Sequence, residues 1–133
     1  MIEKLKKNLK NSYAPYSNFH VSAILVTKEG KQYSGVNIEN ASFGGTICAE
    51  RVAITKAISE GENPKEFKEI HIMCDSKKKA MPCFLCRQTF VEFFNDDVKI
   101  YVYNILGERE EYTLNEVCPL PFSKEGLKWK VVL

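Results

Sequence analysis

Two segments of helical periodicity alternate with two short apolar runs in the central part of this sequence. Apolar residues recur every three or four positions across residues 46–60 and again across residues 85–94, which predicts two helices. The apolar runs at residues 69–75 and 98–103 suit buried strands. Because strands that alternate with helices share one sheet, this pattern predicts a sheet with helices packed on its faces.

The segments before this region add a helix and a hairpin. Residues 2–12 carry apolar side chains at helical spacing and precede Pro15, so we expect an amphipathic helix there. Residues 19–27 and 31–38 are rich in β-branched and aliphatic side chains on either side of a Lys-Glu-Gly turn, which predicts two paired strands.

The C-terminal segments complete an α/β pattern. Residues 110–113 are expected to pair with the strand at 98–103 through a turn at Gly107. A helical turn at 114–117, a last short helix from Ser123 and an anchoring role for Trp129 are also expected. Altogether the order predicts a three-layer α/β/α sandwich around a mixed five-stranded sheet. In the first central helix, Thr46 is expected to be the N-cap and Gly61 the stop.

Size and charge limit the possible partners. The 133 residues, without a Gly/Pro/Ser-rich linker, predict a single domain spanning 1–133. The small core of such a chain suggests that a deep pocket takes walls from another subunit. A net charge of +2 argues against a nucleic-acid partner. No apolar run suits a signal peptide or a membrane span, so we expect a cytoplasmic protein with no membrane partner.

Three of the five cysteines follow a metal-ligand pattern. Cys83 and Cys86 form a Pro-Cys-x-x-Cys motif at the start of the second central helix, and Cys48 lies in the first turn of the earlier one. An odd number of cysteines without a secretory signal disfavours a disulfide framework. Three thiolates at two helix N-termini can converge on one zinc ion, since the helix dipoles favour negative charge there.

A three-ligand site would be catalytic, because structural zinc sites use four protein ligands and catalytic sites leave one position to water. Neither Cys74 nor Cys118 belongs to a ligand motif that would supply a fourth. Glu50 stands two residues after Cys48 and is placed to accept the proton of such a water. This arrangement, a ligand, one residue, Glu and then Pro-Cys-x-x-Cys, is the signature of zinc-dependent nucleobase deaminases.

Two arginines adjoin these residues. Zn²⁺ with three thiolates carries a formal charge of −1, so nearby cations are needed to keep a bound water acidic. Arg51 directly follows Glu50, and Arg87 directly follows Cys86. We expect Arg51, and also Arg87, to contact the thiolates.

With these motifs, the chain resembles the small homo-oligomeric cytidine deaminases that act on free nucleosides. The resemblance extends over nearly the whole chain, through the segments at 14–19, 35–42, 48–51, 82–88 and 120–122. It implies one zinc ion per chain, held by Cys48, Cys83 and Cys86. It also implies attack of water on C4 of cytosine, with Glu50 moving the proton to N3 and then to the departing amine. Cytidine and deoxycytidine would give uridine and deoxyuridine with ammonia, as in pyrimidine salvage.

The same resemblance implies a substrate-binding set and a homotetramer. Asn37 and Glu39 would bind the sugar hydroxyls, and Glu39 would repel a phosphate, which favours an unphosphorylated nucleoside. The loop at residues 40–43 and Phe122 would close the site of a neighbouring subunit. The full expected set is Phe19, Asn37, Glu39, Ala41, Phe43 and Phe122.

The chain departs from the usual family pattern at a few positions, and other functions stay open. The family usually has Gly after the first motif cysteine, where this chain has Phe84 followed by Leu85; Phe43 replaces a common Tyr, and Met81 replaces a common Ser. One alternative is a deaminase of another aminopyrimidine nucleoside, such as a blasticidin-type antibiotic. A zinc-stabilised, non-catalytic module and a thiol redox protein that uses Cys83 and Cys86 are the others.

Overall fold

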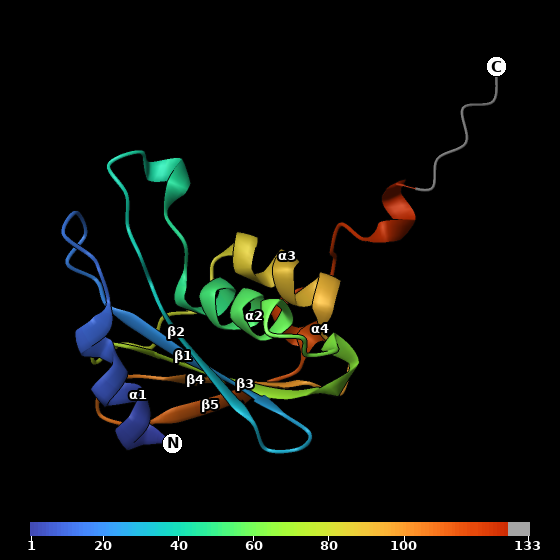
Figure 1. The fold of residues 1–133 in the computed structure, drawn as a ribbon, viewed down its shortest axis with the longest axis horizontal. Helices are drawn as coiled ribbons and strands as arrows, with labels where there is room; N and C mark the ends of the chain where they lie inside the picture. Colours follow the sequence, from blue (N-terminus) through green and yellow to red (C-terminus); the bar gives the residue numbers. More distant parts are fainter. Residues whose placement is uncertain (128–133) are drawn as a thin grey trace.

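The computed structural model describes residues 1–127, so the position of Trp129 lies outside it. Within these residues, five strands form one sheet in the order β2-β1-β3-β4-β5 (Figure 1). The strands are β1 (Val21–Thr27), β2 (Gln32–Val36), β3 (Phe67–Cys74), β4 (Lys99–Tyr103) and β5 (Arg109–Tyr112). The α-helices are α1 (Ile2–Asn8), α2 (Ala49–Ser59), α3 (Phe84–Phe93) and α4 (Leu114–Val117). Short 3₁₀ helices span Leu9–Asn11, Phe43–Gly45, Pro64–Glu66 and Lys124–Leu127.

The sheet is mixed, as the sequence predicts. Strand β1 pairs antiparallel with both β2 and β3, β3 pairs parallel with β4, and β4 pairs antiparallel with β5. A parallel pair needs a crossover connection, which α3 supplies between β3 and β4. Both strand pairs expected from the sequence, β1 with β2 and β4 with β5, are confirmed.

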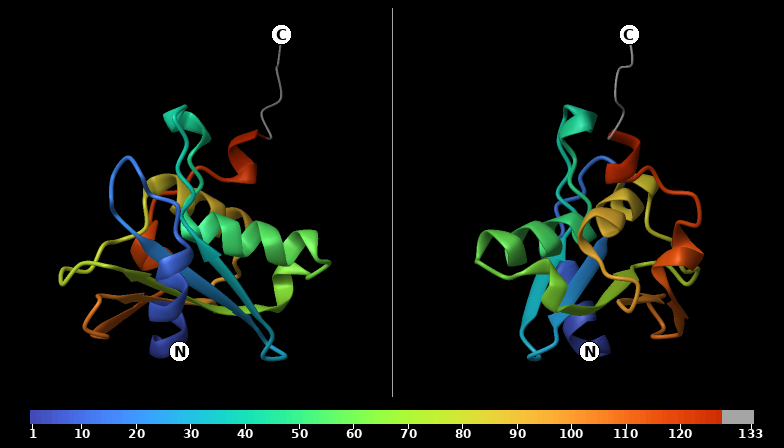
Figure 2. Two further views of the ribbon diagram at one scale, coloured as in Figure 1. Left: turned by 60° about the vertical axis from the view of Figure 1, so that its left-hand side comes forward. Right: turned by 90° about the vertical axis from the view of Figure 1, so that its right-hand side faces the viewer.

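Helices cover both faces of the sheet, so the three-layer prediction is also confirmed. On one face, α1 packs through Leu5 against Ile24 and Met73. On the other face, α2, α3 and α4 share a larger core with the opposite side chains of the same strands (Figure 2). Side chains alternate between these cores along β1, where Ala23 belongs to the larger core and Ile24 to the smaller one. Across residues 1–127, no helix combines the length and apolarity needed to cross a bilayer.

The start of α2 differs from the expectation. Cys48 is the N-cap and the helix begins at Ala49, so the prediction that Thr46 caps it is wrong. Thr46 is extended, and the following Ile47 forms a β-bridge with Ile38. The predicted stop is confirmed, because Gly61 has a φ of +101° directly after the C-cap Glu60.

Gly35 allows α2 to pack very close to β2. A Cβ atom at this position would lie 2.4 Å from the carbonyl oxygen of Ala49 and 2.6 Å from the backbone nitrogen of Ala53. Only glycine fits this approach without a shift of the helix. The contact brings the first turns of α2 against β2, which ends one residue before Asn37.

Candidate metal centre and adjoining cavity

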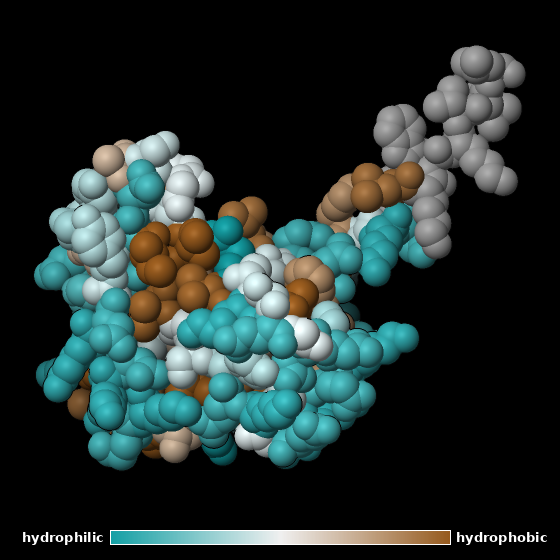
Figure 3. Space-filling model, viewed as in Figure 1, coloured by the Kyte–Doolittle hydropathy of each residue, from teal (hydrophilic) through white to brown (hydrophobic). Residues whose placement is uncertain are grey.

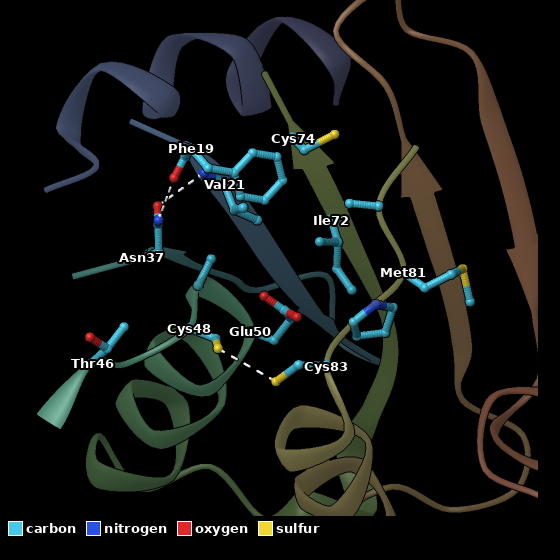
Figure 4. A pocket seen from close by; sticks show the side chains of 13 residues that line it. Phe19, Val21, Asn37, Thr46, Cys48, Glu50, Ile72, Cys74, Met81 and Cys83 are labelled. Carbon is cyan, nitrogen blue, oxygen red and sulfur yellow. Dashed lines mark hydrogen bonds between the residues drawn. The ribbon is translucent and has the colours of Figure 1, made fainter. Parts of the chain in front are cut away.

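Two of the three motif cysteines are the N-caps of helices. Cys48 precedes α2 with φ −71° and ψ 152°, and Cys83 precedes α3 with φ −66° and ψ 164°. Cys86 lies in the first turn of α3 and is fully buried. The two helix N-termini face each other, and the sulfur atoms of Cys48 and Cys83 lie between them (Figure 4). The positive ends of both helix dipoles therefore lie at the sulfur cluster and favour thiolates.

The sulfur atoms fit a tetrahedral zinc ion. The Sγ atoms of Cys48 and Cys83 are 3.7 Å apart, those of Cys83 and Cys86 are 3.6 Å apart, and all three lie within 4.8 Å of one another. Zn–S bonds of about 2.3 Å in tetrahedral geometry separate sulfur atoms by about 3.8 Å. Among residues 1–127, neither Cys74 nor Cys118 belongs to this cluster. The protein thus offers three thiols to a metal that takes four ligands.

The surroundings favour a thiolate at Cys48. A hydrogen bond from the Cys86 thiol lowers the pKa of Cys48 to about 5, and Arg51 contributes to this shift. The same shared hydrogen bond, together with burial, raises the pKa of Cys86. Arg51 donates from Nη2 to Sγ of Cys48 at 3.7 Å and to the carbonyl oxygen of Thr46 at 3.2 Å. Its guanidinium thus connects the sulfur cluster to the segment that leads into α2.

Glu50 places a buried carboxyl group beside the cluster. It lies in the first turn of α2, is only 4% exposed and points into the space next to Cys48 and Cys83 (Figure 4). Burial raises the pKa of Glu50 to about 7. A carboxyl group with a pKa near neutrality can both accept and return a proton at physiological pH.

A cavity of about 180 Å³ opens in front of these groups. Its volume is well below the roughly 300–1,000 Å³ of pockets that enclose a drug-sized ligand. It therefore suits a single flat ring, with any larger substituent outside. The lining residues are Phe19, Val21, Asn37, Thr46, Cys48, Ala49, Glu50, Ile72, Cys74, Ala80, Met81, Pro82 and Cys83.

A second hollow adjoins the first. It is lined by Tyr16, Ser17, Glu39, Phe43 and Thr46, and Thr46 borders both spaces. The carboxylate of Glu39 accepts hydrogen bonds from the backbone N–H groups of Tyr16 at 2.9 Å and Ser17 at 3.1 Å, and from the Ser17 hydroxyl. The Ser17 hydroxyl is the main reason that the pKa of Glu39 is lowered. The hydrogen-bonded carboxylate of Glu39 thus lies in the hollow next to the ring-sized cavity, and Thr46 is the residue that lines both.

The residues predicted for the site fall into three places. Phe19 and Asn37 lie in the main cavity with the cysteines and Glu50, and Glu39 and Phe43 lie in the second hollow. Outside both hollows, Ala41 and Phe122 are exposed, and the carbonyl oxygen of Phe122 accepts a hydrogen bond from Gln88.

Arg87 contacts the segment before Cys83. Its Nε donates to the carbonyl oxygen of Pro82 at 2.7 Å, and Nη1 donates to that of Val117 at 2.9 Å. The guanidinium also lies over the ring of Phe84, 4.5 Å from its centre. Arg87 therefore ties the start of α3 to α4.

Several cavity residues were not identified from the sequence. Val21 and Ile72 have the pattern of ordinary strand residues, and Ala80 lies in an irregular segment. The sequence predicts a capping role for Thr46, whereas this residue borders both hollows. No local pattern marks such positions, because the sheet and the loop after β3 meet only in the folded chain.

The arrangement suits metal-assisted attack of water on a planar ring, the chemistry of a zinc-dependent hydrolytic enzyme. The family model for the cytidine and deoxycytidylate deaminase zinc-binding region matches residues 1–102. The chain belongs to this family.

Several relatives that are named cytidine deaminases match almost the whole chain. A cytidine deaminase of Sporosarcina psychrophila is 40% identical over 97% of this chain and 93% of its own length. One from Halalkalibacterium halodurans is 39% identical over 96% and 95%, respectively. The crystal structure of cytidine deaminase from Burkholderia pseudomallei is 37% identical, covers 91% of this chain and 95% of its own, and superimposes with a TM-score of 0.86. Sequence and fold therefore agree on the family.

Proposed function

We propose that this chain catalyses the hydrolysis of cytidine and deoxycytidine to uridine and deoxyuridine, with release of ammonia. The observation that carries this proposal is the buried Glu50 carboxyl group beside three thiols at a cavity of single-ring size. The names of the relatives support cytidine as the substrate. In the reaction a C4–O bond forms, the C4–N bond breaks, and water supplies the oxygen and two protons.

Cys48, Cys83 and Cys86 would hold one zinc ion per chain. When bound, zinc lowers the pKa of a coordinated water and so supplies a nucleophile at neutral pH. Glu50 accepts one proton of the attacking water and passes it to N3 of the ring, then takes the second from the hydroxyl that forms on C4 and gives it to the departing amino group. A pKa of about 7 allows the Glu50 carboxyl group both to accept and to return a proton near neutral pH.

The two hollows divide the substrate between them. The ring enters the main cavity against Phe19, and the sugar extends past Thr46 toward Glu39. An ionised carboxylate has about four acceptor positions, and Glu39 uses three of them for Tyr16 and Ser17. The remaining position accepts a sugar hydroxyl, and the negative charge disfavours a phosphate. We therefore place the enzyme in nucleoside salvage, and we propose the cytoplasm as its location.

We further propose a homotetramer of single-domain subunits, each spanning residues 1–133. Large apolar side chains lie exposed on the described chain, among them Phe43 at 74%, Phe84 at 76% and Phe122 at 60%. Figure 3 shows an apolar patch between the loop that carries the Phe43–Gly45 helix and α2. Surfaces of this kind mark contact sites. Phe122 and the loop at residues 40–43 would close the site of a neighbouring subunit.

Turnover of a nucleoside panel by purified protein of measured zinc content tests the proposal. Cytidine and deoxycytidine should release ammonia, and Glu50→Gln should lower kcat about 10²- to 10⁴-fold because the proton carrier is lost. Zinc content should stay unchanged in this variant. Glu60→Gln, on the exposed end of the same helix, is the matched control and should retain wild-type rates.

Other outcomes of this experiment identify the competing functions. If the protein deaminates a different aminopyrimidine nucleoside and leaves cytidine unchanged, that nucleoside is the substrate and the assignment of cytidine is wrong. Zinc-free protein with a Cys83–Cys86 disulfide would support thiol redox chemistry. Four protein ligands on the metal would support a structural module.

A further inference from the structure

The side-chain amide of Asn37 is held by three hydrogen bonds on the wall of the main cavity. Nδ2 donates to the carbonyl oxygen of Phe19 at 2.8 Å (Figure 4). Oδ1 accepts from the backbone N–H of Val21 at 3.0 Å and also from the hydroxyl of Ser12. Because two donors meet at the oxygen, both the flip state and the direction of the amide are fixed. Within the described chain, the second hydrogen of Nδ2 is the part of the amide that a ligand can use.

The backbone places Ser12 beside Asn37 independently of its hydroxyl. Its own N–H donates to the carbonyl oxygen of Leu9 at 3.2 Å, at the end of the 3₁₀ helix. The next N–H, of Tyr13, donates to the carbonyl oxygen of Asn37 at 3.0 Å, and the N–H of Glu39 donates back to Tyr13 at 2.8 Å. Removal of the hydroxyl therefore leaves the local backbone pairing in place. What it removes is one of the two donors that orient the Asn37 amide, together with a contact of 3.5 Å to the carbonyl oxygen of Asn37.

We propose that Ser12 is a positioning residue for the sugar of the substrate: its hydroxyl orients the Asn37 amide so that Nδ2 is presented to the 2′ or 3′ hydroxyl of the sugar. This inference rests on the proposed function, which puts the sugar beside Asn37 and Glu39. Since the sugar is remote from the atoms that react, the contact contributes equally to the ground state and the transition state. Its loss changes KM and leaves kcat unchanged.

Kinetics with two substrates test this role. For cytidine, Ser12→Ala should raise KM about two- to tenfold, the value of one hydrogen bond, with kcat unchanged. For 2′,3′-dideoxycytidine, which lacks the 2′ and 3′ hydroxyls of the sugar and keeps only the 5′ hydroxyl, wild type and Ser12→Ala should have equal KM, or equal Ki where turnover is slow. Ser12→Thr keeps a hydroxyl and should restore the KM for cytidine.

Ser22→Ala is the matched control, because it removes another hydroxyl from the junction of α1 and β1. The Ser22 hydroxyl donates to the carbonyl oxygen of Leu5 at 2.8 Å, on the face of the sheet opposite the cavity. This variant should lose stability without a change in KM. Should Ser12→Ala fail to fold, Ser12→Cys provides a poor donor of similar size, and the same rise in KM is expected.

Two results would overturn the inference. One is an unchanged KM for cytidine in Ser12→Ala. The other is the same rise with the dideoxy substrate, which would assign the effect to the ring or to the general shape of the cavity. By contrast, a wild-type protein that leaves cytidine unchanged overturns the proposed function itself, and the assignment of Ser12 falls with it.

Discussion

Cys48 and Cys83 occupy helix positions that usually carry a hydrogen-bonding oxygen. An N-cap Ser, Thr, Asp or Asn accepts a bond from the first backbone N–H groups and stabilises a helix by about 1 kcal/mol. Neither cysteine makes such a bond. A negative sulfur at the N-terminus offsets part of this loss through the helix dipole. The first turns of α2 and α3 are therefore coupled to the charge of the sulfur cluster.

Arg51 is expected to control metal affinity. Its guanidinium donates to Sγ of Cys48 and to the carbonyl of Thr46, so Arg51→Gln removes the cation that balances the thiolates. Zinc affinity should fall about 10- to 100-fold, the usual effect of removing a partner of a metal ligand. Competition with a chromophoric chelator measures this. The control is Arg109→Gln, because the guanidinium of Arg109 lies over the ring of Tyr101. Equal zinc affinity in the wild type, Arg51→Gln and Arg109→Gln would contradict the role of Arg51.

The contact between α2 and β2 determines where the helix N-terminus lies. Gly35 brings the backbone of the strand directly against the first turns of the helix, and Asn37 follows two residues later. The amide of Asn37 and the cysteine at the start of α2 therefore keep a fixed separation. A change at Gly35 acts on both at once, although its own position is outside the cavity lining.

Gly35→Ala should destabilise the fold. The new Cβ would lie 2.4 Å from a backbone oxygen of α2, so the helix must shift, and overpacking of this kind costs about 1–3 kcal/mol. Denaturant unfolding of the zinc-loaded protein measures the change. Gly44→Ala adds the same methyl group where no atom lies within 4 Å and should have little effect. Equal midpoints for the two variants would show that the close contact is not strained.

At this scale the sequence predicts much of the structure. Periodicity identifies α2, α3 and all five strands to within a few residues, because one buried face dictates which positions are apolar. The start of α2 could not be predicted. Ile47 pairs with Ile38 across the loop, and this contact keeps Thr46 extended and moves the cap to Cys48. Local capping preferences carry no information about such a pairing.

For the molecule as a whole, the cluster of three cysteines beside Glu50 could be predicted from the sequence, and the hydrogen bonds around Asn37 only in outline. Cys48, Glu50, Cys83 and Cys86 follow fixed local spacings that specify their chemistry. The orientation of the Asn37 amide depends instead on chain segments that meet only after the sheet has formed. Sequence spacing cannot supply that geometry.

Assembly should depend on the exposed apolar side chains at the start of α3. Phe84 and Leu85 are 76% and 61% exposed. Light scattering should give wild-type protein a mass about four times that of the chain, and the double variant Phe84→Ser, Leu85→Ser a lower one, because apolar contact area is lost. The specific activity of the double variant should fall on dilution, because its subunits dissociate. Leu106→Ser, 60% exposed in the β4–β5 turn, is the control and should leave the mass unchanged. A fully active wild-type monomer would contradict the proposal.

Acid stability should depend on His71, on the face of the sheet covered by α1. Burial lowers the pKa of His71 below 6.5, the Glu69 carboxylate at 3.4 Å opposes this shift, and Arg109 and the N-terminal amine add to it. Nδ1 lies 2.8 Å from the Tyr103 hydroxyl. The unfolded state binds the proton of His71 more tightly than the folded state does. The stability that neutral His71 contributes is therefore present above its pKa in the unfolded state, and it is lost as the pH falls through its pKa in the folded state.

Unfolding free energies measured at about pH 7.5 and about pH 5.5 test this linkage. Wild-type protein should lose more stability over this interval than His71→Gln, which has no titrating ring. Tyr33→Phe leaves the ring of His71 in place and should have the wild-type pH dependence. Parallel pH profiles for wild type and His71→Gln would exclude His71 as the source.

The edge strand β5 limits the kinds of assembly that this molecule can form. Three of its four residues, Arg109, Glu110 and Glu111, are charged and exposed, and Glu110 and Glu111 form ion pairs with Lys79 and Lys99. Charged edge strands disfavour pairing with a strand of another chain. Extension of the sheet at this edge by a second copy, which would lead to a fibre, is thus disfavoured. Contacts made instead through the helical layer can close on themselves, which keeps the particle finite in size.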